Sequence, residues 1–108
     1  MAALAELSRE LEVVGVHAFV STGDGYTAHV RNFAPLYGVD EESATGTANA
    51  ALTHYLQRQG LVQKGSECAF LQGEKMGRSS VVETLLCPDG TIYVGGRCSI
   101  VARGELLV

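Results

Sequence analysis

The chain has 108 residues, of which 46% are hydrophobic, which is enough for one ordinary core and too few for two. We therefore expect a single domain over residues 1–108. Eight Lys and Arg stand against twelve Asp and Glu, so the formal net charge is −4 and no basic surface is available for a phosphate backbone. We therefore expect no nucleic-acid partner.

Features of a secreted, membrane-bound or metal-binding protein are absent from the sequence pattern. No uninterrupted apolar run follows the charged first eleven residues, so we expect a soluble cytoplasmic protein with no membrane partner. The three cysteines are spaced neither as a CxxC metal site nor as a disulfide framework, which indicates reduced thiols. The three histidines also lack metal-ligand spacing, so no metal is expected.

The first third of the chain predicts one helix and two strands. Leucines at positions 4, 7 and 11 share one face of a helix over 2–11. Residues 13–20 are rich in β-branched and aromatic side chains, a turn-forming cluster covers 21–25, and strand alternation resumes over 27–34. These segments predict a β-hairpin or two neighbouring strands.

The middle of the chain predicts the main helix. Polar and acidic residues over 38–43 precede a helix start near Ala44, and Gly60 ends the helix. One face is apolar and unusually small at its N-terminal end: Ala44, Ala48, Ala51, Leu52, Tyr55 and Leu56. Small residues let surrounding backbone come close, as expected for a helix enclosed by a curved sheet.

The last part of the chain predicts a β-meander. Strands are expected at 66–71, 80–86, 91–94, 98–102 and 105–108, with a strong turn at 87–90. The order of elements predicts an α+β fold in which an antiparallel, strongly curved, barrel-like sheet wraps around one central helix.

The start of the main helix is the strongest candidate binding site. Its free N–H groups and the helix dipole favour an anion, and Gly46, between Thr45 and Thr47, lets a ligand approach the backbone, so a small carboxylate would be held well. Alternatively, Thr45 or Thr47 caps the helix and the preceding acids complement its dipole. Glycine between two threonines favours the ligand slightly, and both interpretations stay open.

Five separated segments form recognisable motifs: RNFAP at 31–35, YGV at 37–39, EESATGTAN at 41–49, QGEKMGRSS at 72–80 and VGG at 94–96. In order and spacing they resemble the patterns R-x-F-A-P, G-[VI], E-D-P-A-T-G-S-A, Q-G-x-x-M-G-R-P-S and V-G-G of the PhzF-like isomerases. The resemblance covers nearly all of this chain and corresponds to the C-terminal half of a family member.

The resemblance implies one half of a two-domain enzyme with the diaminopimelate-epimerase fold. Such enzymes move a proton next to a carboxylate of a small metabolite, without metal or organic cofactor, in a cleft between the halves. Glu42 matches the family's Asp and becomes the catalytic candidate. The substrate-binding candidates are Ala44, Thr45, Gly46, Thr47, Ala48 and Gly73. Ser43 replaces a family proline, which predicts a freer loop.

The family's general acid/base glutamate belongs to the first half and has no counterpart here. Either two copies of the chain form a homodimer or a separate N-terminal half completes the site. The rival hypothesis is a non-catalytic remnant of a split or truncated gene that binds a small carboxylate. Glu42 is a weak replacement, because a carboxylate beside a helix N-terminus is held in its charged form. A hot-dog-like thioesterase shares a helix wrapped by a sheet but offers no motif match.

Overall fold

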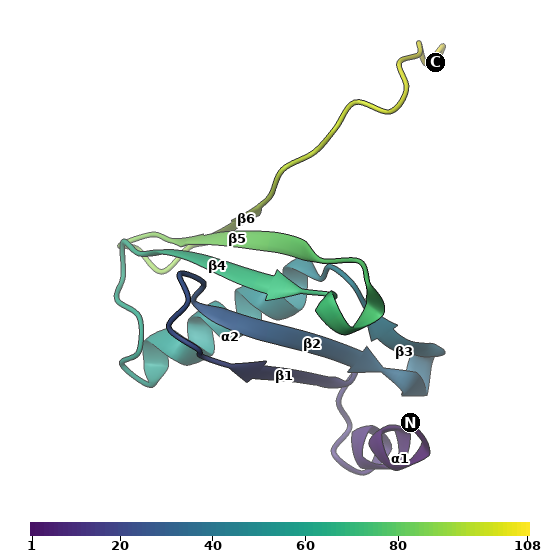
Figure 1. Ribbon diagram of the computed structural model, residues 1–108, viewed down its shortest axis with the longest axis vertical. Coiled ribbons are helices and arrows are strands. Elements are labelled where there is room, and N and C mark those ends of the chain that lie inside the picture. Colours follow the sequence, from purple (N-terminus) through teal and green to yellow (C-terminus); the bar gives the residue numbers. More distant parts are fainter.

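The computed structural model describes all 108 residues as a six-stranded sheet with one long helix across a single face (Figure 1). The elements in chain order are α1 (Ala2–Glu10), β1 (Val16–Val20), β2 (Ala28–Ala34), the 3₁₀ turn η1 (Pro35–Tyr37), β3 (Val39–Glu42), α2 (Gly46–Arg58), β4 (Glu67–Gln72), the 3₁₀ turn η2 (Glu74–Met76), β5 (Ser80–Leu86) and β6 (Ile92–Gly95). The α+β class is as the sequence predicts.

The sheet is mixed and open, which corrects the expectation of an antiparallel sheet wrapped around a helix. Its order is β1-β2-β4-β5-β6, and β2 pairs with β4 in parallel through Ala28↔Phe70 and Val30↔Gln72. The chain between these two strands contains α2, and a helical crossover of this length is what parallel pairing requires. The other strand pairs are antiparallel.

Strand β3 is an element that sequence reasoning placed in a loop. It pairs with the C-terminal part of β2 through Asn32↔Glu42 and Ala34↔Val39, with an irregularity between the two pairs. Because β1 runs along the whole of one edge of β2, the other edge is divided between β4 and β3. The acidic residues of β3 are therefore held beside the end of β2.

Helix α2 packs on the sheet with a face that shares only Leu52 and Leu56 with the apolar face expected from the sequence. Its buried residues are Asn49, Leu52, Thr53 and Leu56, whereas Ala51 and Tyr55 are exposed. Asn49 and Thr53 are tolerated there because both side chains are hydrogen-bonded. Asn49 Nδ2 donates to the Thr45 backbone carbonyl oxygen at 2.8 Å, and the Thr53 hydroxyl donates to the Asn49 backbone carbonyl oxygen at 2.8 Å and lies 2.7 Å from the Thr84 hydroxyl. The apolar core beneath consists of Ala28, Val30, Leu52, Leu56, Cys68 and Phe70.

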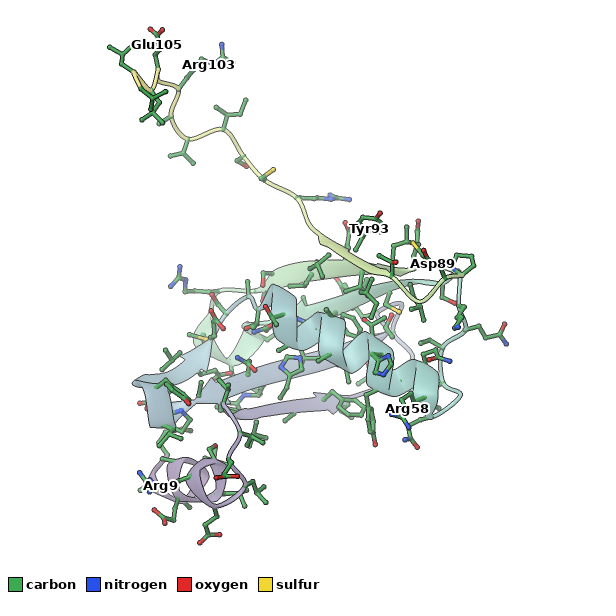
Figure 2. All side chains as sticks on the ribbon, turned by 180° about the vertical axis from the view of Figure 1, so that it is seen from behind. Arg9, Arg58, Asp89, Tyr93, Arg103 and Glu105 are labelled. Atoms are coloured by element: carbon green, nitrogen blue, oxygen red, sulfur yellow. The ribbon has the colours of Figure 1, made fainter.

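The chain after β6 does not form the two further strands expected at 98–102 and 105–108. It leaves the body of the molecule in Figure 1, and Figure 2 shows Arg103 and Glu105 far from the sheet. Its apolar side chains are almost fully accessible, for example Ile100 at 83% and Val101 at 95%. A strand needs a partner for its backbone groups, and no other segment of this chain lies beside it.

Helix α1 lies against η1 and the end of β2, at the margin of the sheet (Figure 1). Its Ser8 is fully buried, and the Ser8 hydroxyl donates to the Leu4 carbonyl oxygen at 2.8 Å. Neither helix has the length and apolar character needed to cross a bilayer.

Candidate functional site

A groove of about 520 Å³ lies between β1 and the exposed side of α2. Figure 2, seen from the helix side, shows α2 lying uncovered across the sheet. Polar side chains around the helix start line one part of the groove: His17, Asn32, Glu42, Thr45 and Thr47. The rest is apolar and includes Val14, Ala34, Ala48, Ala51, Leu52 and Tyr55.

Four of the seven predicted site residues line this groove. They are Glu42, Thr45, Thr47 and Ala48. The other three, Ala44, Gly46 and Gly73, do not. A Cβ added to Gly46 would meet Val94 Cγ1 at 3.4 Å, so the free side of this glycine faces β6.

Thr45 is the N-cap residue of α2, but its side chain does not cap the helix. The Thr45 hydroxyl instead donates to Glu42 Oε2 at 2.7 Å. The first N–H groups of a helix have no partner within the helix. The Thr45 N–H is satisfied by Gln72 Oε1, whereas those of Gly46, Thr47 and Ala48 have no side-chain partner. Of the two interpretations left open by the sequence, side-chain capping by Thr45 is therefore wrong, and binding of an anion at the helix start stays a prediction.

The loop between β3 and α2 is held by side chains from β4 and β5. Gln72 Nε2 donates to the Glu42 carbonyl oxygen at 2.8 Å, and the Thr45 N–H donates to Gln72 Oε1 at 3.2 Å. The Ser80 hydroxyl donates to the Ser43 carbonyl oxygen at 2.6 Å. These bonds restrain the segment that was expected to be freer for want of a proline at position 43.

Gly73 lies close to the backbone of the loop between β3 and α2. Its φ of +83° is one that only glycine adopts readily, and an added Cβ would lie 2.3 Å from the Arg78 carbonyl oxygen and 2.9 Å from that of Ser43. The residue therefore allows the turn after β4 to pack against the loop that carries Glu42. This placement gives the glycine a packing role and puts it outside the groove.

Three polar residues that sequence reasoning left out of the site meet beside the helix start. His17 Nδ1 lies 3.1 Å from Asn32 Oδ1, and His17 Nε2 lies 3.1 Å from Asn49 Oδ1. Asn49 Nδ2 in turn donates to Gln72 Oε1 at 2.9 Å. The signal is the register of the strands, in which His17 and Asn32 are directly opposed on β1 and β2, and only the folded structure shows that pairing.

Together these side chains close a hydrogen-bonded circuit, which we call the polar ring. Asn32 Nδ2 approaches Glu42 Oε2 at 3.4 Å, and Gln72 Nε2 donates to Thr45 Oγ1 at 3.0 Å, so the circuit returns to its starting point. No buried side-chain nitrogen or oxygen of the protein lacks a partner. The members of the polar ring are His17, Asn32, Glu42, Thr45, Asn49 and Gln72.

Glu41, the neighbour of Glu42, is not part of the ring. Arg31 Nε and Nη2 each donate to one Glu41 carboxylate oxygen at 2.9 Å. This hydrogen-bonded pair lowers the pKa of the Glu41 carboxyl and raises the pKa of the Arg31 guanidinium. Of the two adjacent acids, one is therefore paired with a cation and the other is directed to the groove.

Comparison with known proteins identifies the family. The model of the phenazine biosynthesis-like (PhzC-PhzF) family matches residues 2–104. An uncharacterized isomerase of Deinococcus radiodurans is 39% identical over 107 residues, covering 93% of this chain and 34% of that protein. The trans-2,3-dihydro-3-hydroxyanthranilate isomerase of Pseudomonas chlororaphis is 35% identical over 69 residues, covering 64% of this chain and 24% of that enzyme.

A solved structure gives the same result. A protein described as a predicted epimerase, from Pseudomonas aeruginosa, superposes with a TM-score of 0.70 at 30% identity, covering 97% of this chain and 36% of that one. The chain belongs to the phenazine biosynthesis-like family, whose relatives here are isomerases and an epimerase. It spans about a third of the length of the Deinococcus relative (34%) and of the Pseudomonas aeruginosa structure (36%).

Proposed function

We propose that this chain forms one wall of the active site of an isomerase or epimerase that shifts a proton next to a carboxylate of a small metabolite. The groove at the start of α2 is the observation that carries the proposal. Free helix N–H groups, Thr47 and Thr45 would bind the substrate carboxylate, and Glu42 would face the reacting carbon. No metal or organic cofactor is needed for such a proton shift between two side chains.

The second wall would come from a partner, either a second copy of the chain or a separate N-terminal half. Two observations support a partner. Apolar side chains beside the groove are exposed, including Tyr55 at 49% and Phe19 at 40%, which meet edge to face. The extended apolar segment after β6 has no neighbour in this chain.

A partner would also complete the sheet. Strands β1 and β6 are its two edges, and α2 lies between them on one face. Strands added at these edges would close the sheet around the helix and give the barrel-like half expected from the family resemblance. The cytoplasmic location expected from the sequence goes with such a metabolic role.

The alternative is a domain that binds a small carboxylate without catalysis. It is favoured by the same groove, because Glu42 is the sole carboxylate that lines it and a proton shift between two faces of a carbon needs a second acid/base. The family's glutamate from the first half would be that second group. The choice between the two functions therefore depends on whether a partner brings it.

Proton exchange distinguishes these functions. The chain is incubated with candidate 2-amino and 2-hydroxy acids in deuterated water, alone and together with the product of any adjacent open reading frame that encodes a first half. Deuterium incorporation next to the carboxylate, lost in Glu42→Gln and kept in Glu41→Gln, is the expected result. No incorporation under either condition would reject the isomerase function, and calorimetric binding without exchange would support the carboxylate-binding domain.

The form of the partner is measured separately. Light scattering that gives a monodisperse monomer would remove the version of the proposal in which two copies complete the site. Co-purification with a first half, and an exchange rate that rises with its concentration, would support the other version.

A further inference from the structure

Residues 98–108, which we call the tail, have the side-chain pattern of a strand with one buried face. Successive side chains of a strand point to opposite faces. All the polar side chains of the tail fall on one face, and they are Ser99, Arg103 and Glu105. The opposite face is apolar or small throughout: Cys98, Ile100, Ala102, Gly104, Leu106 and Val108. This apolar face is not packed against the chain, since Ile100 is 83% and Leu106 85% exposed.

Strand β1 is the sheet edge at which an added strand would bury such a face. It has β2 on one side and no strand on the other. Helix α2 packs against β5 and β6, and the groove of about 520 Å³ separates it from β1. Inward side chains of a strand added to β1 would enter the apolar part of this groove, between Val14, Ala51 and Tyr55. The other edge, β6, offers no such space, because the helix lies against it.

The tail of the same chain is badly placed to fill this edge. It starts after β6, and the strand order puts β6 four strand spacings from β1, a distance of roughly 19 Å. At about 3.3 Å per residue, the crossing would use about six residues and take Ile100 out of the strand. The crossing would also pass over the start of α2, because a Cβ added to Gly46 would meet Val94 Cγ1 at 3.4 Å. The tail instead leads away from the sheet (Figure 1).

We propose that two copies of the chain swap their tails, each tail adding a strand to the outer edge of β1 in the other copy. A second copy is the partner that offers both elements. Each copy has one free β1 edge and one free tail, and a reciprocal swap about a two-fold axis satisfies all four. Backbone hydrogen bonds hold such an added strand, and its alternate side chains select the register.

The swap supplies part of the second wall of the active site, and this consequence rests on the proposed function. The apolar face of the tail covers the groove beside Ala51 and Tyr55. The polar part of the groove at Glu42, Thr45 and Thr47 stays open. A substrate therefore reaches the groove from the end at which the helix N–H groups lie. The swap itself does not depend on catalysis.

Size-exclusion chromatography with light scattering, over a range of concentrations, tests the swap on the full chain. We expect the wild type to have twice the monomer mass of 11.4 kDa. Ile100→Asp puts a charge on the inward face of the tail and should weaken the dimer at least about tenfold. Val101→Asp is the matched control, because Val101 is the next residue, is 95% exposed and belongs to the outward face. It should leave the affinity within about twofold of the wild type.

A mixing experiment tests whether the tail of one copy meets the groove of another. Tyr55→Glu places a charge in the groove and leaves the tail intact, and half-exposed Tyr55 tolerates the change. Tyr55→Glu and Ile100→Asp should each be mostly monomeric at a concentration at which the wild type is dimeric. An equal mixture should form dimers with one copy of each, since an intact tail then meets an intact groove.

Amide hydrogen exchange locates the added strand. The amides of Val16–Val20 should be better protected in the wild type than in Ile100→Asp, whereas those of Ile92–Gly95 should be the same in both. Protection at β6 in place of β1 would reject the swap as proposed. Protection at β1 in a monomer would mean that each tail closes its own sheet, which would also reject it.

A monodisperse monomer at every concentration would overturn the inference, as would equal weakening by Ile100→Asp and Val101→Asp, or a mixture that stays monomeric. Failure of the proposed function is a separate result. A swapped dimer that incorporates no deuterium next to a carboxylate keeps the swap and rejects the isomerase activity. Deuterium incorporation by a monomeric chain with an added N-terminal half keeps the isomerase activity and rejects the swap.

Discussion

The side-chain amide of Gln72 joins both ends of the loop before α2, donating to the Glu42 carbonyl oxygen and accepting from the Thr45 N–H. Gln72→Leu should lower the free energy of unfolding by roughly 1–3 kcal/mol, because the Glu42 carbonyl oxygen and the Thr45 N–H lose these partners and Asn49 Nδ2 keeps only the Thr45 carbonyl oxygen as an acceptor. Urea denaturation measures the change. The control, Gln63→Leu, alters an exposed glutamine and should stay within about 0.5 kcal/mol of the wild type. Equal effects of the two changes would contradict the bridging role.

Gly73→Ala tests the contact behind the site. The new Cβ would collide with backbone oxygens of Ser43 and Arg78 at an unfavourable positive φ, and we expect a loss on the order of 3 kcal/mol in thermal or urea unfolding. Gly77→Ala has a similar φ of +67° with nothing within 4 Å, so it reports the backbone preference alone, about 1 kcal/mol. If Gly73→Ala is no worse than Gly77→Ala but loses carboxylate binding, Gly73 contributes to the ligand site rather than to packing.

The hydrogen bonds of His29 predict a pH-dependent stability. His29 Nε2 lies 2.5 Å from Asp24 Oδ2 and His29 Nδ1 lies 2.7 Å from Glu74 Oε2. Asp24, and after it Glu74, raises the pKa of His29 above its usual 6.5, and His29 lowers the pKa of Asp24 below 3.8. The stabilisation is therefore fully present between pH 3.8 and pH 6.5, the ordinary pKa values of the two groups. It is lost as the pH rises through the raised pKa of His29, and also as the pH falls through the lowered pKa of Asp24.

Urea unfolding of the wild type and His29→Gln measures this effect. The wild type should exceed the variant by more at about pH 5 than at about pH 8.5, with a small difference because these side chains are partly exposed to solvent. His54→Gln, an exposed histidine of α2, should show no such trend. A difference that does not change with pH would mean that the three groups are not coupled.

Thr47→Tyr tests the groove as a ligand site. The larger side chain at the start of α2 would occupy the space assigned to a substrate carboxylate, so affinity should fall at least about tenfold, or about 1.4 kcal/mol, for any small carboxylate that binds the wild type. Titration calorimetry measures the affinity, and an unchanged melting temperature shows that the exposed position tolerates the change. Thr22→Tyr, far along the chain in an exposed turn, serves as the control. Unchanged affinity in Thr47→Tyr would place the ligand elsewhere.

The local sequence pattern predicted most of the helices and strands, but it did not predict that β2 and β4 pair in parallel. Helical spacing gave α1 and α2, and alternation gave β1, β2, β4, β5 and β6 to within a few residues. Strand β3 was missed because its sequence, VDEE, has the polar composition of a loop and is held by pairing with β2. The parallel pairing of β2 and β4 depends on where α2 packs, which is a tertiary property that strand pattern alone does not contain.

The candidate site was predicted in part for a related reason. Glu42, Thr45, Thr47 and Ala48 are contiguous around the helix start, so a motif can identify them. The other side chains of the polar ring come from β1, β2, β4 and the second turn of α2, and only the folded chain brings them together. The strands predicted at 98–102 and 105–108 were wrong, because the pattern of these residues suits a strand but no other segment of the chain lies beside them.

The division of one edge of β2 between β3 and β4 has a consequence for the order of folding. The β4–β5 hairpin involves neighbours in sequence and can form early, whereas β2 meets β4 only after about forty residues have been gathered into one loop. The polar ring spans that late junction. We therefore expect Glu42 to reach its final position in the last stage of folding, so that only a fully folded chain has a competent site.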